Sequence, residues 1–241
     1  MKLLKYGILY FRDKDFRLPS VFRVHGIKRT LEFNEKSSPA LMYEFLEICI
    51  NDCYNLEKIH RSLGEVKSIV DVGANQGLFA LAARSQYPNA TITCYEPNEQ
   101  LRQYLHPNAV KLSAIDYYEA VTKDDCKVLL DFGDTDLHTQ TRISNTGRIP
   151  GTSLRKVIER AGGKIDILKL DCEGAEWALL EDESAWENIG AVTMEYHLWA
   201  KESSNTTMLI ARLKDLQFEI CTHAPVSPTF GIITAMKQKA A

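Results

Sequence analysis

Three acidic side chains follow a short apolar run in the second half of the chain. The segment DILKLDCEGAEW, residues 166–177, passes from the run Ile167–Leu170 directly into Asp171, Glu173 and Glu176. Burying a carboxylate is costly unless another group pairs with it or uses it. The acidic cluster therefore marks either the start of a helix or a functional site.

Similar groups of polar residues follow the other predicted strands. They are Asp71 to Gly77, Glu96 to Asn98, Glu119, and Glu195 to His197. In an open α/β sheet, ligands bind outside the carboxyl ends of the strands. We therefore expect these residues to meet Asp171 to Glu176 at one edge of a sheet.

The hydrophobic pattern that positions these residues alternates between strand and helix signals. Apolar runs predict strands over 68–72, 90–95, 116–121, 165–170, 192–196, 218–222 and 231–236, with an added strand or hairpin over 126–132. Helical spacing predicts helices over 39–60, 78–84, 99–105, 153–161, 175–180 and 208–216. This alternation predicts an α/β fold with a Rossmann-like, doubly wound, mostly parallel sheet of seven strands and helices on both faces. The connection 223–230 is too short for a helix and predicts a C-terminal antiparallel hairpin.

The segment DVGANQG, residues 71–77, joins the first strand of this sheet to a helix. Gly73 and Gly77 allow a tight turn and a close approach of the backbone to a ligand. Asn75 and Gln76 stand where a dinucleotide-binding fingerprint has glycines, which weakens a pyrophosphate-binding interpretation. A glycine-rich turn without a ligand is the alternative.

An acid at the end of the second strand suits a nucleoside ligand. Glu96, in the segment CYEPN, lies nineteen residues after Gly77, where a carboxylate can accept hydrogen bonds from both ribose hydroxyls. Charge-assisted hydrogen bonds of this kind contribute roughly 1.5–3 kcal/mol each. Together with the glycine turn, Glu96 favours a ligand over the alternative of an exposed acid beside a Pro-Asn turn.

At this point the sequence resembles the FkbM-type methyltransferases, which use S-adenosylmethionine (SAM). The segments that carry the resemblance, over about residues 65–220, are IVDVGANQG, YEPN, LKLDCEGAEW and MEYH. The resemblance implies that three groups of residues contact the cofactor. The amino-acid portion of SAM would contact Asp71, Gly73, Ala74, Asn75 and Gly77. The ribose would contact Glu96, Pro97 and Asn98, and the adenine would contact Glu119 and Ala120. The chain departs from the family pattern at Arg155, where the family often has an aspartate.

The acids after the fourth and fifth predicted strands lie near the expected position of the reactive methyl group. Asp171 suits a positioning role there, because a carboxylate close to the cationic sulfonium or amino group of SAM is electrostatically favourable. We expect Glu173 and Glu195 to shape the pocket and Asp171 also to contact the cofactor. Glu176 suits the N-terminus of a helix, where the dipole stabilises negative charge by about 0.3–1 kcal/mol.

His197 completes the predicted catalytic set. A histidine whose pKa lies near neutrality can accept a hydroxyl proton, so His197 is the expected base. A surface histidine in the loop before Leu198 and Trp199 is the alternative.

These features predict O-methylation of a hydroxyl by direct displacement on SAM. The resemblance implies a small-molecule acceptor, either a carbohydrate, a glycolipid or a polyketide-type natural product. The alternatives are a magnesium-assisted O-methyltransferase with Asp171, Glu173 and Glu195 on Mg²⁺, a SAM-binding module without catalysis, and a nicotinamide oxidoreductase. The preferred prediction includes no metal.

Composition narrows the class of protein further. The 241 residues have a formal net charge of −3, and a nucleic-acid partner is not expected because no strongly basic region is present. The six scattered cysteines favour reduced thiols and a cytoplasmic location. No apolar run is long enough for a transmembrane segment. The sequence carries no signal for an oligomeric state.

Two regions carry no recognisable motif. We expect residues 1–60 to form strands and a helix packed on the core, followed by the methyltransferase domain over 61–241. Residues 1–60 and 132–152 are the expected determinants of acceptor specificity.

Overall fold

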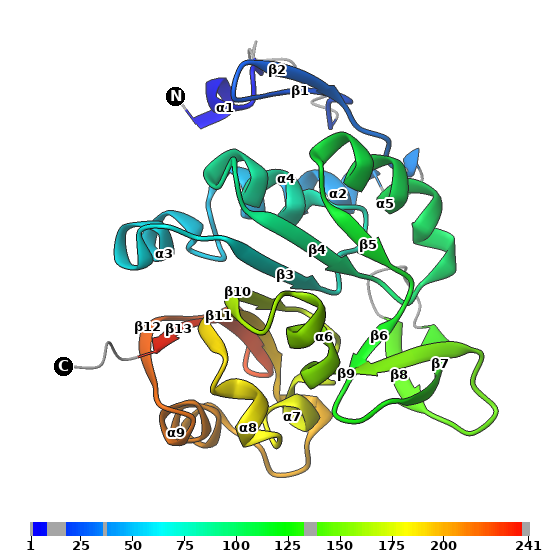
Figure 1. The fold of residues 1–241 in the computed structure, drawn as a ribbon, viewed down its shortest axis with the longest axis vertical. Helices are drawn as coiled ribbons and strands as arrows, with labels where there is room; N and C mark the ends of the chain where they lie inside the picture. Colours follow the sequence, from blue (N-terminus) through cyan, green and yellow to red (C-terminus); the bar gives the residue numbers. More distant parts are fainter. Residues whose placement is uncertain (1, 9–17, 36–37, 133–138, 238–241) are drawn as a thin grey trace.

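A seven-stranded sheet forms the centre of the computed structural model, which describes residues 2–8, 18–35, 38–132 and 139–237 (Figure 1). The strands lie in the order β12-β13-β11-β10-β3-β4-β5. Their bounds are β3 (Ser68–Val72), β4 (Thr91–Tyr95), β5 (Ile115–Tyr117), β10 (Ile165–Leu170), β11 (Ile189–His197), β12 (Phe218–Pro225) and β13 (Phe230–Lys237).

The sheet is mixed. Strands β11, β10, β3, β4 and β5 run parallel, whereas β13 pairs antiparallel with both β11 and β12. The α/β class of the prediction is confirmed, and its detailed strand arrangement is confirmed in part. The strand predicted over 218–222 is longer in the structure, because β12 continues to Pro225. Proline is tolerated there since β12 is an edge strand.

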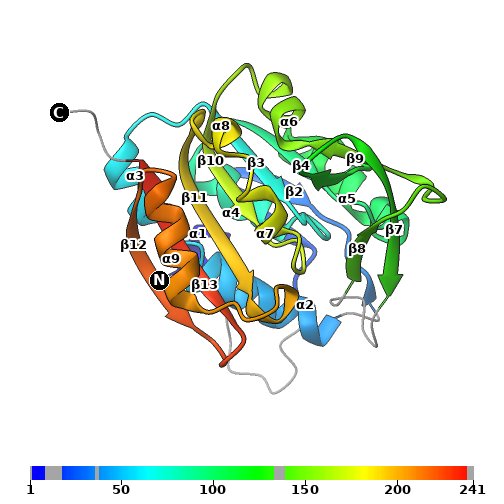
Figure 2. The same cartoon turned by 90° about the horizontal axis from the view of Figure 1, so that it is seen from below.

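Helices cover both faces of the sheet (Figure 2). One face packs against α2 (Ser38–Phe45), α3 (Leu56–Leu63), α4 (Leu78–Gln86) and α5 (Glu99–Leu112). The other packs against α6 (Leu154–Arg160), α7 (Glu176–Leu179), α8 (Glu183–Trp186) and α9 (Thr206–Asp215). Successive side chains of β3 point to opposite faces of the sheet. Ile69 is buried against the first group of helices and Val70 against the second.

Two predicted helices have different lengths in the structure. The expected helix over 39–60 is divided into α2, a π-helical turn η2 (Leu46–Ile50) and α3, because Asp52 and Asn55 adopt left-handed backbone angles (φ 55° and 56°). By contrast, α5 continues past the expected end at residue 105 and runs through Pro107 to Leu112, which is fully buried. Long-range packing outweighs the cost of one proline in that helix.

A second, four-stranded sheet follows β5. Its strands lie in the order β6-β9-β7-β8, with bounds β6 (Ala120–Thr122), β7 (Cys126–Phe132), β8 (Thr139–Ile143) and β9 (Ile149–Ser153). The predicted strand over 116–121 was therefore wrong in one respect, since it is divided between β5 of the main sheet and β6 of this one. The added strand over 126–132 is confirmed as β7.

The N-terminal residues pack against the helices of the first layer. They form α1 (Lys2–Lys5) and the antiparallel hairpin β1 (Val21–Val24) and β2 (Ile27–Thr30), at the top of Figure 1. Phe22 lies against Phe45 of α2, with ring centroids 5.7 Å apart. The division into residues 1–60 and 61–241 stays a prediction.

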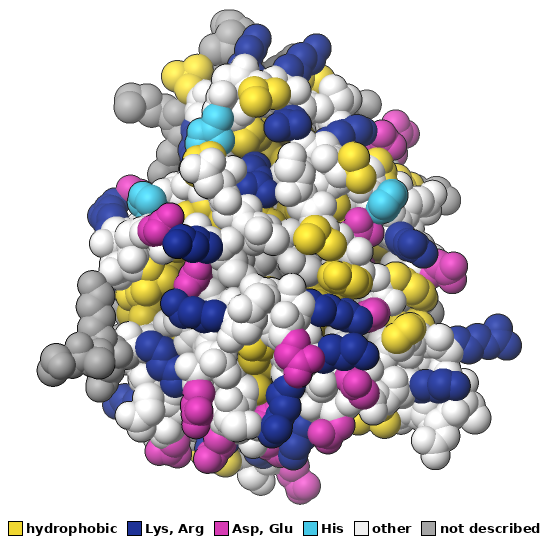
Figure 3. Space-filling view, viewed as in Figure 1, with side chains coloured by type: hydrophobic (Ala, Val, Ile, Leu, Met, Phe, Trp, Pro, Cys, Tyr) yellow, Lys and Arg dark blue, Asp and Glu magenta, His cyan; other side chains and the backbone are white. Residues whose placement is uncertain are grey.

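Lys and Arg side chains alternate with Asp and Glu over the face drawn in Figure 3. Among the described residues, no helix combines the length and the apolar character that a membrane crossing requires.

Arg84 ties the ends of α4 and α5 to the core. Its side chain is only 7% exposed, and its guanidinium donates hydrogen bonds to main-chain carbonyl groups of the two following loops. The acceptors are the carbonyl oxygens of Tyr87, Pro88, Ala90, Leu112 and Ser113.

We expect Arg84→Met to lower the free energy of unfolding by at least about 3 kcal/mol, because buried carbonyl groups lose their donors. Urea denaturation followed by circular dichroism measures this change. The exposed Arg148→Met is the control and should stay within about 0.5 kcal/mol of the parent. Equal losses in the two variants would contradict the role given to Arg84.

Candidate functional site

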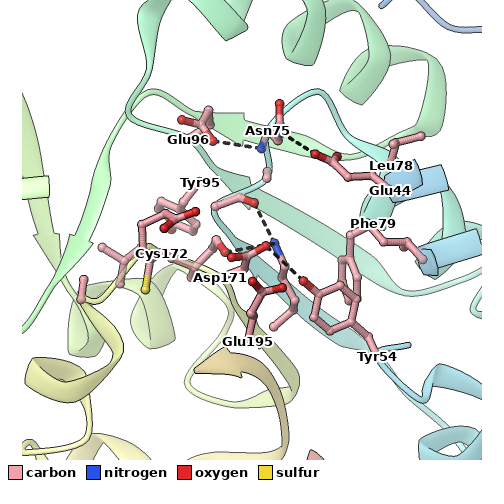
Figure 4. Close-up of a pocket in the computed structure, with 18 of the residues that line it drawn as sticks. Glu44, Tyr54, Asn75, Leu78, Phe79, Tyr95, Glu96, Asp171, Cys172 and Glu195 are labelled. Atoms are coloured by element: carbon pink, nitrogen blue, oxygen red, sulfur yellow. Dashed lines mark hydrogen bonds and ion pairs between the residues drawn. The ribbon is translucent and has the colours of Figure 1, made fainter. Parts of the chain in front are cut away.

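A cavity of about 340 Å³ lies at the carboxyl ends of the parallel strands (Figure 4). Its wall includes most of the residues that the sequence placed at this edge. They are Gly73, Ala74, Asn75, Glu96, Pro97, Asn98, Glu119, Ala120, Asp171, Glu173 and Glu195. Asp71, Gly77 and His197, which the sequence also placed at this edge, are not among the described residues that line it.

Gly73 allows the two central strands to end in close contact. Its φ is +76°, and a Cβ atom built on it would lie 1.7 Å from the carbonyl oxygen of Asp171. Only glycine fits this position. The turn is anchored from the other side, because the N–H groups of Gly73 and Ala74 both donate to the carbonyl oxygen of Tyr95, at 3.0 and 3.1 Å.

Glu96 is held in place by backbone donors on both sides. Its two oxygens accept hydrogen bonds from the N–H of Asn75, at 2.9 Å, and the N–H of Asn98, at 2.8 Å. Burial raises the pKa of Glu96 to about 7, although both hydrogen bonds favour its ionised form. Each oxygen keeps acceptor capacity for a further donor. Figure 4 shows Asn75 between Glu96 and Glu44.

Glu119 and Ala120, which are predicted to contact adenine, also line the cavity. Glu119 forms an ion pair with Arg160, at 2.6 Å, and the Arg160 guanidinium lies 4.5 Å from the centre of the Tyr117 ring. Ala120 is the first residue of β6. Because Glu119 is already paired, its carboxylate is oriented by a neighbouring side chain.

A buried lysine links the two central strands. Lys169 of β10 is 3% exposed, and its Nζ lies 3.1 Å from Asp71 Oδ1 and 3.6 Å from Asp171 Oδ2. It also donates a hydrogen bond to the carbonyl oxygen of Gly73, at 2.7 Å. Burial lowers the pKa of Lys169, but the two aspartates raise it more, so the ammonium stays charged.

Asp71 therefore acts behind the cavity wall. Its side chain is fully buried, and neither carboxylate oxygen accepts a hydrogen bond with good geometry from any described residue. Burial raises its pKa, and the Lys169 ammonium limits that rise. The ion pair with Lys169 is thus the interaction that compensates its charge.

Tyr54 completes this arrangement from the N-terminal part of the chain. Its hydroxyl donates to Asp171 Oδ2 at 3.1 Å, and its ring lies 5.6 Å from Lys169 Nζ. No motif in residues 1–60 pointed to Tyr54, so sequence reasoning missed it. Lys169 was missed too, although a lysine inside an otherwise apolar strand is a signal for a buried ion pair.

His197 lies at the end of β11, before the short 3₁₀ helix η3 (Leu198–Ala200), and carboxylates surround it. Nδ1 lies 3.3 Å from Glu176 Oε1, and Nε2 lies 3.5 Å from Glu195 Oε1 and 3.7 Å from Glu173 Oε2. Burial lowers the pKa of His197, but these acids raise it to about 10. The expected near-neutral pKa is therefore wrong, because the sequence could not show that three acids converge on one ring.

Glu173 and Glu195 separate His197 from the cavity. Burial is the main cause that raises their pKa values, to about 7 for Glu173. Glu176 lies deeper, and its Oε1 accepts a hydrogen bond from the N–H of Cys172 at 3.1 Å. Its side chain thus contacts both the backbone before the helical turn and His197, and its capping role stays a prediction.

The family model and the curated relatives agree on one enzyme class. The model for the family described as "Methyltransferase FkbM domain" matches residues 71–220. Methyltransferase sdnD of Sordaria araneosa is 26% identical over 240 residues, covering 80% of this chain and 89% of that protein. Methyltransferase 1 of Beauveria bassiana is 24% identical over 210 residues, covering 71% and 81%. Among solved structures, magnesium protoporphyrin IX methyltransferase of Synechocystis PCC 6803 has 13% identity and a TM-score of 0.45, with 76% of each chain covered.

We expect Lys169→Met to lower the free energy of unfolding by about 3–5 kcal/mol, because it leaves Asp71 buried without a cation. Adding Asp71→Asn should recover a large part of this loss, since the uncompensated charge is then removed as well. Urea denaturation measures both values.

Lys164→Met is the matched control for the lysine change. Lys164 pairs with Asp166 at 2.9 Å but is 68% exposed, so we expect a loss below about 1 kcal/mol. If the single Lys169 variant and its double variant unfold at the same urea concentration, buried charge is not the cause.

Proposed function

The chain belongs to the FkbM methyltransferase family, and from this premise we propose that it methylates a hydroxyl group on a sugar, a glycolipid or a polyketide-type natural product. SAM is the cofactor of this methyltransferase. When bound, SAM supplies a methyl carbon that the adjacent sulfonium makes electrophilic. The observation that carries the choice of a hydroxyl acceptor is the pair of carboxylates, Glu173 and Glu195, in the cavity wall beside Asp171.

The residues at the nucleoside end of the cavity fit SAM. Glu96 presents a buried carboxylate with remaining acceptor capacity, which suits the two ribose hydroxyls. The absence of a Cβ at Gly73 lets backbone line the wall where a side chain would otherwise stand. We assign ribose binding to Glu96, with Pro97 and Asn98 beside it, and the amino-acid portion of SAM to Gly73, Ala74 and Asn75.

Asp171 lies between this nucleoside end and the catalytic acids. Tyr54 and Lys169 both contact its Oδ2, which holds the carboxylate in one orientation. We assign to Asp171 the positioning of the positively charged part of SAM. Asp71 serves the cofactor indirectly in this proposal, since it reaches the wall only through Lys169.

An alcohol loses its proton as its oxygen attacks the methyl carbon. Methyl transfer then forms one C–O bond and breaks one C–S bond, and the proton passes to a base. Glu195 lines the cavity whereas His197 does not, so we assign the base to Glu195. His197 lies behind this carboxylate, with Nε2 3.5 Å from Glu195 Oε1, and does not accept the proton itself.

The acceptor end of the cavity combines acids with an apolar wall. Val226, Phe230 and Ile232 of the C-terminal hairpin line it, and Tyr43 and Ile48 line it from the N-terminal part of the chain. This composition supports an acceptor that carries an apolar part beside its hydroxyl. It also supports the proposal that residues 1–60 contribute to specificity.

The affinity for S-adenosylhomocysteine should depend on pH through Glu96. Its carboxylate is protonated below the pKa of about 7 and then accepts ribose hydrogen bonds less well. We therefore expect the dissociation constant to fall about tenfold between pH 6 and pH 8. Calorimetric titration should show a weaker and nearly pH-independent affinity for Glu96→Gln, and no binding of NAD to either protein. The same slope in Glu96→Gln would remove Glu96 from the ribose site.

Product analysis tests the reaction itself. Incubation with methyl-labelled SAM and a panel of methyl glycosides, glycolipids and phenolic polyketides should place the label on oxygen, as read by mass spectrometry and NMR. With an accepted substrate, Glu195→Gln should lower kcat by about 10²–10⁴-fold, because a positioned base contributes that much. Its affinity for S-adenosylhomocysteine should change less than about twofold. Label on nitrogen or carbon, or an unchanged kcat, contradicts the proposal.

A further inference from the structure

Three side chains near the end of β10 and β11 converge on one point. A carboxylate oxygen of Asp171, one of Glu173 and a ring nitrogen of His197 all lie within 4.8 Å of one another. Asp171 and Glu173 line the cavity, and His197 lies directly behind them with a side chain that is 5% exposed. An ion held by these three groups would therefore be part of the cavity wall.

The orientation of His197 matches that of a metal ligand. A metal-bound histidine usually donates its second ring N–H to a carboxylate, which fixes the ring and its tautomer. Here Nδ1 faces Glu176 Oε1 at 3.3 Å. Nε2 faces Glu173 and Glu195 at 3.7 and 3.5 Å, which is longer than a direct N–H···O hydrogen bond. The ring is thus oriented on one side and open to a further ligand on the other.

In the same cluster, negative charge exceeds positive charge. Glu176 is 1% exposed, and its Oε2 is buried without a hydrogen-bond partner among the described residues. Three carboxylates, those of Glu173, Glu176 and Glu195, share His197, while Lys169 pairs with Asp71 and Asp171. Buried charges of one sign require a compensating group.

We propose that Asp171, Glu173 and His197 bind a divalent transition-metal ion, with Glu176 orienting the histidine. A mixed set of carboxylate and imidazole donors suits first-row ions such as Mn²⁺ or Co²⁺, whereas Mg²⁺ prefers oxygen ligands alone. An ion at this position lowers the pKa of a hydroxyl that binds to it. That catalytic consequence rests on the proposed function, but the binding of the ion does not.

Calorimetric titration of the chelator-treated protein with MnCl₂ tests the site directly. We expect saturable binding of one Mn²⁺ per chain and weaker binding of Mg²⁺. His197→Gln should weaken Mn²⁺ binding at least tenfold. Glu173→Gln, at a side chain that is 19% exposed, should do the same with less risk to folding.

His106→Gln is the matched control. His106 Nδ1 also faces a carboxylate, Asp116 Oδ1 at 2.9 Å, but no further acid surrounds it among the residues that the structure describes. This variant should bind Mn²⁺ like the parent. Titration of each sample with S-adenosylhomocysteine reports separately on folding and on the proposed function. Absence of saturable Mn²⁺ binding by protein that binds S-adenosylhomocysteine overturns the metal site, as does unchanged Mn²⁺ affinity in both ligand variants.

Discussion

The buried ammonium of Lys169 is the interaction on which the rest of the site depends. It lies between Asp71 of β3 and Asp171 at the end of β10, and these two strands are neighbours in the centre of the sheet. Its third contact, with the carbonyl oxygen of Gly73, also holds the glycine turn. One cation therefore sets the separation and the relative orientation of the turn and of Asp171.

This arrangement explains why an apolar strand ends in acids. Asp171 is compensated by Lys169 and Tyr54, whereas Glu173, Glu176 and Glu195 share His197. Two clusters, each centred on one cationic side chain, thus lie side by side at the same edge of the sheet. In the proposed reaction the Lys169 cluster positions the cofactor, and the His197 cluster takes up the proton that the acceptor hydroxyl loses. Asp171 lies where the two clusters meet.

Most of the main sheet could be predicted because its signals are local. Apolar runs within short windows identified β3, β10 and the C-terminal hairpin. The central strands β3 and β10 are apolar at successive positions, which is why both of their faces are buried. The division of 116–121 between two sheets could not be predicted in this way, because the run continues while its hydrogen-bonding partners change. The break between α2 and α3 likewise depends on the left-handed backbone angles of Asp52 and Asn55. An aspartate or an asparagine can adopt such angles, but its presence in the sequence does not show that it does.

The sequence by itself determined the glycine turn, the position of Glu96 after β4 and the acids after β10, because each is a residue type at the end of one element. Tertiary structure alone decided that Lys169 bridges Asp71 and Asp171, and that Tyr54, 117 residues from Asp171, reaches the same carboxylate. It also decided that His197 lies behind the cavity wall among three acids. The physical reason is that burial and charge pairing depend on groups that distant segments bring together, which no local pattern records.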